Sequence, residues 1–192
     1  DHLGGRAMAT DWGHRILSNQ SKLYDPLSYH YGSVWPLFTG WASMAAYRYG
    51  RPHIGWQALQ ANVHLSTSGA LGYVTELISG DFMAPFGRSS HHQVWSQAMV
   101  ATPLVRGLLG LEVDRAASHV RFVPQPPADW DSFTVSRVPV AGGVLQLSHR
   151  REGDSRVIAW QHSAPRLDLT LGVVVPRKAL TEPAGEPFGD GQ

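Results

Sequence analysis

Residues 32–50 read GSVWPLFTGWASMAAYRYG and contain the signals that decide how the first half of this chain folds. Ser33 is of a type that caps helices, and Pro36 falls in the first turn, where its missing N–H removes no helical hydrogen bond. Gly50 is a natural C-terminal stop. The stretch therefore predicts a helix from Val34 to Tyr49, capped by Ser33.

Two further helices are expected downstream. Apolar residues recur at helical spacing from Pro52 to Ser66, and a third helix is predicted from His92 to Leu109, ended by Gly110. Pro103 is expected to kink this third helix, because proline has no N–H to donate. Residues 67–90, between the second and third helices, lack periodicity, and loops of that length are often functional.

The pattern changes after the third helix. Apolar and polar residues alternate along 143–150 and 166–175, which is the period of a half-buried antiparallel strand. Further strands are expected near 119–123, 132–140 and 155–162. Ala141-Gly142-Gly143 is expected to form a hairpin turn.

These signals divide the chain into three segments. Residues 1–114 carry the helices and the long loop, and residues 115–176 are predicted to form a small antiparallel β module. Residues 177–192 are rich in Pro, Gly and Glu and are expected to be a flexible tail. The predicted fold class is mainly α plus β.

Composition limits the functions to consider. The chain has 192 residues, 43% of them hydrophobic, and a net charge of +1, which gives no reason to invoke nucleic acid or a membrane surface. No apolar run approaches the roughly 20 residues that span a bilayer. Seven Trp and a charged fraction of only 16% favour an uncharged, ring-containing ligand, although a Trp-rich core would give the same counts.

Cellular location is left open, with the cytoplasm slightly favoured. The chain has no Cys, so disulfides and thiolate metal sites are excluded, but this does not decide between the cytosol and export. Because the chain begins at Asp1 without a Met, we expect it to be a piece of a longer protein.

Residues 75–98, TELISGDFMAPFGRSSHHQVWSQA, hold the first candidate site residue. Glu76 lies in a predicted loop, where a carboxylate acts as a general base toward water or serves as a surface residue or helix cap. Tyr29, His30, Tyr31 and Trp35 precede or begin the first helix, where rings stack on a sugar or pack into the core.

A second polar and aromatic cluster lies near the start of the chain. Asp11 and Trp12 are followed by Arg15, so Asp11 is suited either to bond a sugar hydroxyl or to cap a turn with Arg15 as its partner. The side chains of His91, His92, Asp81 and Glu76 raise the question of a metal site. Adjacent His residues rarely ligate one ion, so no metal is expected. No phosphate-binding loop or nucleophile elbow is present.

Several of these segments together resemble a known family. The resemblance rests on ATDWG-x-R-x-LS, YHYGSVWP, E-L-x-SG, VWSQA and P-L-x-RGLLGLE, in that order. They are similar to the C-terminal part of bacterial amylo-α-1,6-glucosidase (glycogen-debranching) proteins, which are six-hairpin glycosidases with an (α/α)6 catalytic barrel. The resemblance covers about residues 7 to 135, and HVRFVPQPPADW resembles the family's exit from its last barrel helix.

The resemblance implies a role for each candidate. Glu76 would be the general base of an inverting hydrolase of α-glucosidic bonds, a reaction that needs no cofactor. Substrate-binding residues would be Asp11, Trp12, Arg15, His30, Tyr31, Trp35, His92 and Trp95. Residues 1–114 would then be the C-terminal part of a barrel, and the partners an oligo- or polysaccharide and either the remainder of the barrel or a second copy.

Two departures from the family pattern stand out. Leu37 follows GSVWP where the pattern often has a polar residue, and no candidate for the general acid, which lies in an earlier hairpin, is found here. Two alternatives therefore stay open. One is a sugar phosphorylase on the same fold, and the other is a non-catalytic carbohydrate-binding or structural fragment.

Overall fold

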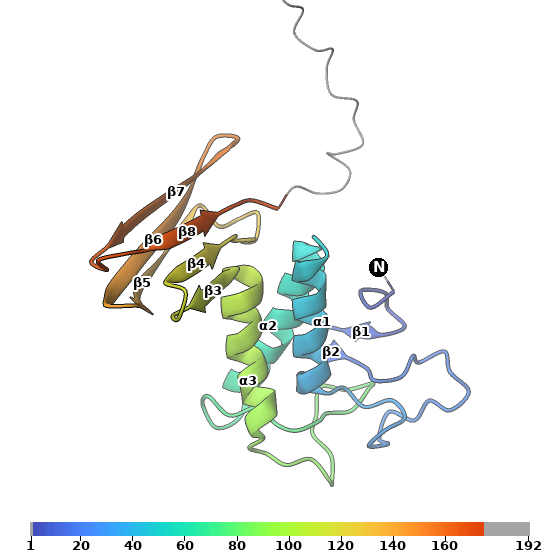
Figure 1. Cartoon of the computed structure of the whole chain (residues 1–192). Helices are drawn as coiled ribbons and strands as arrows, with labels where there is room; N and C mark the ends of the chain where they lie inside the picture. The colour runs from blue at the N-terminus through green and yellow to red at the C-terminus, as the bar shows by residue number, and fades with distance from the viewer. Residues whose placement is uncertain (1, 175–192) are drawn as a thin grey trace, which may run out of the picture.

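The computed structural model describes residues 2–174 and contains three α-helices followed by a β region (Figure 1). The helices are α1 (Pro36–Arg48), α2 (Pro52–Ser68) and α3 (Val94–Thr102). The three predicted helices are confirmed, with ends displaced by two residues or so. The predicted flexible tail, residues 177–192, lies outside the described part of the chain.

The start of α1 corrects one prediction. Pro36 occupies the first turn as expected, but Trp35 is the N-cap and no side chain caps the helix. The Ser33 hydroxyl instead donates to the Tyr29 carbonyl at 3.1 Å and accepts from the Trp35 indole N–H at 3.0 Å. Ser33 is fully buried, so its hydroxyl stabilises the turn before the helix instead of the helix itself.

The predicted third helix is two structures in sequence. After α3, residues Pro103–Leu108 form a π-helix, η1, and the Leu109 N–H donates to the Leu104 carbonyl at 2.9 Å. The change begins at Pro103, which has no N–H to continue the α-helical ladder. Gly110 follows the segment with a φ of 55°, the left-handed conformation in which glycine commonly ends a helix. The predicted stop at Gly110 is confirmed.

Close packing of the helices depends on small residues and one amide. Tyr47, Leu59 and Leu108 form a buried cluster between α1, α2 and η1. A Cβ on Gly107 would lie 2.5 Å from the Tyr47 ring, so only glycine permits this approach. The Asn62 side-chain amide donates to the Pro36 carbonyl at 2.9 Å and the Met99 carbonyl at 3.0 Å, which links the three helices.

The β region consists of two three-stranded sheets. One contains β3 (Leu111–Asp114), β4 (His119–Phe122) and β8 (Asp168–Leu171), and the other β5 (Ser132–Val140), β6 (Gly143–Glu152) and β7 (Ser155–His162). The strands predicted near these positions are confirmed, and β5 and β6 are joined by the predicted tight turn, with Val140 opposite Gly143.

Two features of the β region differ from the prediction. Strand β3 was not expected, because four residues after a glycine give too short a pattern to recognise. The module is also not wholly antiparallel, since β8 pairs parallel to β4 with His119 opposite Asp168. Parallel pairing needs a long connection, and the whole β5–β7 sheet supplies it here.

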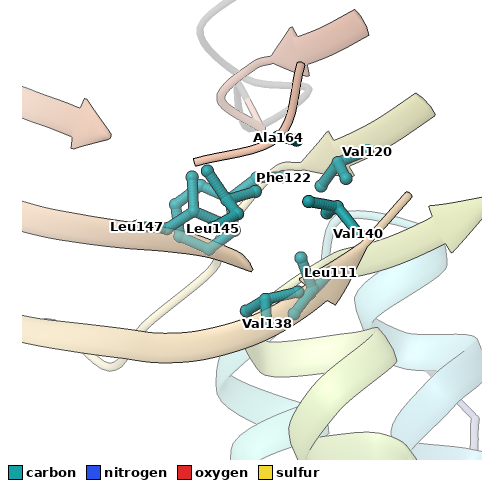
Figure 2. Close-up of a cluster of buried hydrophobic side chains, with 8 residues drawn as sticks. All are labelled: Leu111, Val120, Phe122, Val138, Val140, Leu145, Leu147 and Ala164. Carbon is teal, nitrogen blue, oxygen red and sulfur yellow. The ribbon is translucent and has the colours of Figure 1, made fainter. Parts of the chain in front are cut away.

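The two sheets face each other across one apolar core (Figure 2). Strands β3 and β4 contribute Leu111, Val120 and Phe122, while β5 and β6 contribute Val138, Val140, Leu145 and Leu147, with Ala164 preceding β8. The alternation that predicted β6 is the one observed, because Leu145 and Leu147 are fully buried and Gln146 is exposed.

The architecture is therefore mixed α+β. A third, two-stranded sheet pairs β1 (Ala9–Thr10) with β2 (Gly13–His14) beside the helices. Within residues 2–174 the three helices do not close into a barrel. No helix in this part of the chain has the length and apolar character to cross a membrane.

Candidate functional site

Three segments that are distant in sequence lie side by side near the start of α1. Val34 forms isolated β-bridges with Arg15 on one side and Ile78 on the other. Val34 and Ile78 exchange both backbone hydrogen bonds at 2.9 Å. This bridge brings the Asp11–Arg15 cluster, the aromatic segment before α1 and the loop that contains Glu76 into one region.

Glu76 is the buried carboxylate of this region, with 7% of its surface exposed. The Tyr29 hydroxyl donates to Oε1, and the Ser90 backbone N–H donates to Oε2 at 3.2 Å. The Glu76 N–H in turn donates to the Ser90 carbonyl at 2.7 Å. Both carboxylate oxygens are therefore oriented by donors, one from a side chain and one from the backbone.

Ser89 is hydrogen-bonded to the residues on either side of Glu76, Thr75 and Leu77. Its hydroxyl donates to the Leu77 carbonyl at 2.7 Å and accepts from the Leu77 N–H at 3.1 Å. The Thr75 hydroxyl lies 2.5 Å from the same oxygen. Residues on both sides of Glu76 are thus bonded to one serine, which limits the movement of the carboxylate.

A row of aromatic rings extends from Glu76 to the outer face of α1. The Tyr29 ring centroid lies 4.7 Å from that of Trp35 in an edge-to-face contact, and Trp35 lies 5.6 Å from Phe38. Phe38 in turn lies 5.2 Å from Trp41. His30 stacks on Trp35 at 6.5 Å with ring planes 11° apart. Three of the four predicted ring residues before α1, Tyr29, His30 and Trp35, therefore belong to one chain of contacts, whereas Tyr31 is exposed.

The hydrogen bond between Tyr29 and Glu76 changes the pKa of the Tyr29 hydroxyl. The hydrogen bond to the Glu76 carboxylate raises the pKa of the Tyr29 hydroxyl above its ordinary value, and partial burial adds to the effect. Tyr29 is therefore protonated at neutral pH and is the donor in this pair. The bond also fixes the orientation of the Glu76 Oε1 atom.

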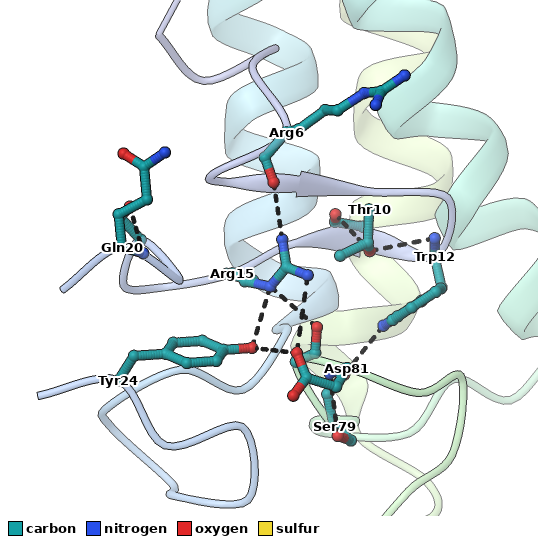
Figure 3. Close-up of polar contacts among 11 residues, drawn as sticks. Arg6, Thr10, Trp12, Arg15, Gln20, Tyr24, Ser79 and Asp81 are labelled. Carbon is teal, nitrogen blue, oxygen red and sulfur yellow. Dashed lines mark hydrogen bonds and ion pairs between the residues drawn. The ribbon is translucent and has the colours of Figure 1, made fainter. Parts of the chain in front are cut away.

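Arg15 organises the second cluster (Figure 3). Its Nε donates to the Gly80 carbonyl at 2.9 Å and the Tyr24 hydroxyl at 3.1 Å, and its NH1 donates to the Arg6 carbonyl at 3.1 Å. Asp81 completes the network, accepting from Tyr24 at 2.7 Å and lying 3.9 Å from the guanidinium. Arg15 thus holds the chain segment that follows Glu76.

Trp12 and Asp11 occupy different environments beside this network. The Trp12 indole N–H donates to the Ser79 carbonyl at 2.9 Å, and its ring packs against the cluster around Val34. Asp11 lies exposed in the turn between β1 and β2. The substrate contacts predicted for Asp11, Trp12 and Arg15 stay predictions, while the bonds of Trp12 and Arg15 attach them to the loop that contains Glu76.

His92 and Trp95 lie on the far side of the same loop. The His92 ring contacts Tyr73 with centroids 4.2 Å apart, and both line a small cavity of about 230 Å³. Trp95 lies in the first turn of α3, partly exposed. Neither side chain is hydrogen-bonded to Glu76 in the part of the chain the structure describes, so their predicted role in substrate binding stays a prediction.

Within residues 2–174, no group of three His, Asp or Glu side chains is arranged to hold a metal ion. His91 and His92 are both exposed and adjacent in the loop before α3. The donor groups on the Glu76 carboxylate are one phenol and one backbone amide, and neither is a metal ligand of the usual kind.

Two contacts of the region were not predicted from the sequence. Tyr29 was considered only as a ring for stacking, yet it bonds Glu76 across a separation of 47 residues. Tyr24 was not a candidate, and Asp81 was considered only for the possible metal site, although both residues complete the Arg15 network. No local spacing signals the Tyr29–Glu76 or Tyr24–Asp81 contact, because their partners are 47 and 57 residues apart in the sequence.

Comparison with protein-family models finds no match to this chain. Comparison with curated proteins finds no relative either.

Proposed function

We propose that this chain is the base-bearing part of a glycoside hydrolase that cleaves α-glucosidic bonds with inversion of configuration. One observation carries the proposal: a buried carboxylate, Glu76, is oriented by two donors and adjoins a continuous row of aromatic rings. Carbohydrate sites require this pairing, because carboxylates move protons and flat rings meet the apolar faces of sugars.

In this proposal Glu76 accepts a proton from a water molecule. The water oxygen forms a bond to the anomeric carbon while the glycosidic bond breaks on the opposite face of the sugar. A second carboxylic acid protonates the departing oxygen, and inverting enzymes place it roughly 6.5–9.5 Å from the base. This acid is expected outside residues 1–192, in a part of the polypeptide that also completes an (α/α)6 barrel with α1–α3.

Tyr29 has a supporting role in this chemistry. Its hydrogen bond to Oε1 fixes the orientation of that oxygen. The Ser90 N–H does the same for Oε2. Trp35 and His30 would line the sugar pocket, with Tyr31 at its exposed rim.

A sugar phosphorylase is the first alternative. Phosphate would replace the activated water, and a base would then be unnecessary, so the buried and hydrogen-bonded Glu76 favours hydrolysis. The second alternative is a carbohydrate-binding fragment without catalysis, in which the row of rings would act alone.

The test uses the longer polypeptide that contains this chain, assayed on malto-oligosaccharides with and without phosphate. Glu76→Gln is expected to lower kcat by about 10²–10⁴ while substrate binding persists. Glu112→Gln, an exposed change on β3, is the matched control and should leave kcat unchanged. NMR of the first product should show the β anomer.

Each alternative has its own outcome in this test. Cleavage that requires phosphate would establish the phosphorylase. Unchanged turnover in Glu76→Gln would remove Glu76 from the chemistry. Saccharide binding without turnover by the wild-type polypeptide would leave the binding function alone.

A further inference from the structure

A cavity of about 540 Å³ lies where the ends of α1 and η1 meet the sheet of β3 and β4. Ligand cavities often form at such junctions, with volumes of roughly 300–1,000 Å³. Glu76 does not line this cavity, so it is separate from the site described above. We call it the junction pocket, and its charged and amide side chains are those of Arg48, Arg106, Glu112, Arg121 and Gln125.

Positive charge dominates the lining of the junction pocket. Arg48 belongs to α1, Arg106 to η1 and Arg121 to β4, so three separate elements each contribute one guanidinium. Glu112 on β3 is the single carboxylate among the described lining residues, and its Oε1 lies 4.0 Å from Arg121. Three positive charges less one negative charge leave an excess of two. Because like charges repel, a pocket with this excess favours an anion.

Arg48 and Arg106 form no hydrogen bond or ion pair in the part of the chain that the structure describes. Arginines near a helix C-terminus often bond the last carbonyls. Here two of those carbonyls have other donors, because the Gln125 side-chain amide donates to the Tyr47 carbonyl at 3.1 Å and the Gln125 backbone N–H donates to the Leu108 carbonyl at 2.7 Å. The two arginines are therefore not used as helix caps, and their N–H donors are available to a ligand.

The sequence that follows the pocket adds to this excess. Val174 lines the junction pocket, and the next charged residues along the chain are Arg177 and Lys178. The first carboxylate, Glu182, comes eight residues after Val174. The chain therefore supplies two more cations before it supplies a carboxylate that could offset the arginines.

We propose that the junction pocket binds a small polyanion that carries two phosphoryl groups. A guanidinium is planar and binds phosphate oxygens through two parallel N–H···O bonds, so guanidiniums from three elements can hold a ligand with several such oxygens. A diphosphate also offsets the excess of two positive charges, which a single carboxylate would not. Arg48 and Arg106 are exposed, so the affinity should be moderate and should fall as the salt concentration rises. The proposal is independent of the reaction at Glu76.

The test is isothermal titration calorimetry of the 192-residue chain with pyrophosphate. We expect saturable binding at one site per chain, at least about tenfold tighter than the binding of sulfate at the same ionic strength. ADP distinguishes the source of the phosphoryl groups, because tighter binding of ADP would assign the pocket to an organic diphosphate, and equal binding to the diphosphate group alone. Glu76→Gln should bind pyrophosphate like the wild type.

Four variants locate the binding. Arg48→Gln and Arg106→Gln each remove one guanidinium and should weaken pyrophosphate binding about tenfold or more, with the urea midpoint unchanged. Glu112→Gln removes the lining carboxylate and should have the opposite effect, a tightening of about two- to fivefold. Arg115→Gln is the matched control, because Arg115 is an exposed arginine between β3 and β4 that does not line the pocket. Its binding should equal that of the wild type.

Several results would overturn the proposal. One is the absence of saturable binding, and another is equal affinity for pyrophosphate and sulfate at the same ionic strength. Equal weakening by Arg106→Gln and Arg115→Gln would show a response to net charge and not to the pocket. Saturable binding of a hexaglutamate peptide, with no response to pyrophosphate, would assign the arginines to a carboxylate-bearing partner.

Discussion

Replacing Arg15 by Met removes the guanidinium while keeping most of the apolar stem, so it tests the polar network alone. Arg15 is 9% exposed and donates three hydrogen bonds, two of them to the backbone carbonyls of Gly80 and Arg6. Hydrogen bonds from a charged donor contribute about 1.5–3 kcal/mol each, and their losses are not additive. We expect Arg15→Met to lower the free energy of unfolding by about 3–5 kcal/mol.

The comparison variant is Asp81→Asn, which alters only the ionic part of the same network. Asp81 lies 3.9 Å from the guanidinium, its side chain is 43% exposed, and an amide oxygen can still accept from Tyr24. Such a pair contributes about 0–1 kcal/mol. The variant should therefore unfold close to the wild type.

Urea unfolding of the 192-residue chain, followed by tryptophan fluorescence and by far-UV circular dichroism, measures both variants. The midpoint of Arg15→Met should fall well below that of Asp81→Asn, with similar slopes. Equal losses in the two variants would refute the reasoning, because the ion pair and not the carbonyl bonds would then hold the loop. A loss below about 1 kcal/mol for Arg15→Met would refute it as well.

Three further outcomes follow from other contacts. Tyr29→Phe removes the hydrogen bond to the Glu76 carboxylate and should lower the free energy of unfolding by about 1 kcal/mol in urea. An unchanged urea midpoint would contradict the contribution of this bond. Burial, with Arg156 nearby, lowers the pKa of His149. As the pH falls below about 6.5, His149 takes up a proton in the unfolded chain before it does so in the folded chain. The contribution of His149 to stability is therefore fully present above that pH and is lost as the pH falls through the lower pKa of the folded state. His149→Phe should reduce the drop in urea midpoint between pH 7.5 and pH 5.5, and a full-sized drop would exclude His149 as a source. Gly110→Ala would place a Cβ 2.0 Å from the Val123 carbonyl oxygen at a φ of 55°, so it should lower the free energy of unfolding by about 3 kcal/mol or more. The control is Gly87→Ala, whose Cβ would meet no atom within 4 Å and whose free energy of unfolding should stay within about 0.5 kcal/mol of the wild type in the same urea assay. Similar losses in the two variants would contradict the packing described for Gly110.

The helices were predictable because their limits are set by residues inside the segment. Pro36 and Pro52 begin α1 and α2, and Gly110 ends η1, each through the backbone angles that its own ring or missing Cβ allows. The same reasoning placed the β5–β6 turn at Ala141-Gly142-Gly143, and Gly143 is the first residue of β6. The prediction that Ser33 caps α1 was wrong, because its hydroxyl bonds the Tyr29 carbonyl instead. The preference of serine for helix starts does not take account of such a competing partner.

The sequence predicted which residues belong to the candidate site, but not the contacts between them. A carboxylate at Glu76 and rings before α1 are visible in the sequence, but their joining through Tyr29 is not. Likewise, Arg15 was expected beside Asp11, four residues away, and instead bonds Gly80, from which it is separated by 65 residues.

The amino-acid sequence by itself determined the order and limits of the helices and most strands, the division into a helical half and a β half, and the residues able to do acid–base or stacking chemistry. Steric limits and period-two or helical patterning act over a few residues, so they can be read along the chain. Only the tertiary structure decided the parallel pairing of β8 with β4, the bridge of Arg15, Val34 and Ile78, and the bond between Tyr29 and Glu76. Those contacts form when packing brings distant segments together, and which donor then meets which acceptor depends on the whole arrangement, not on any segment alone.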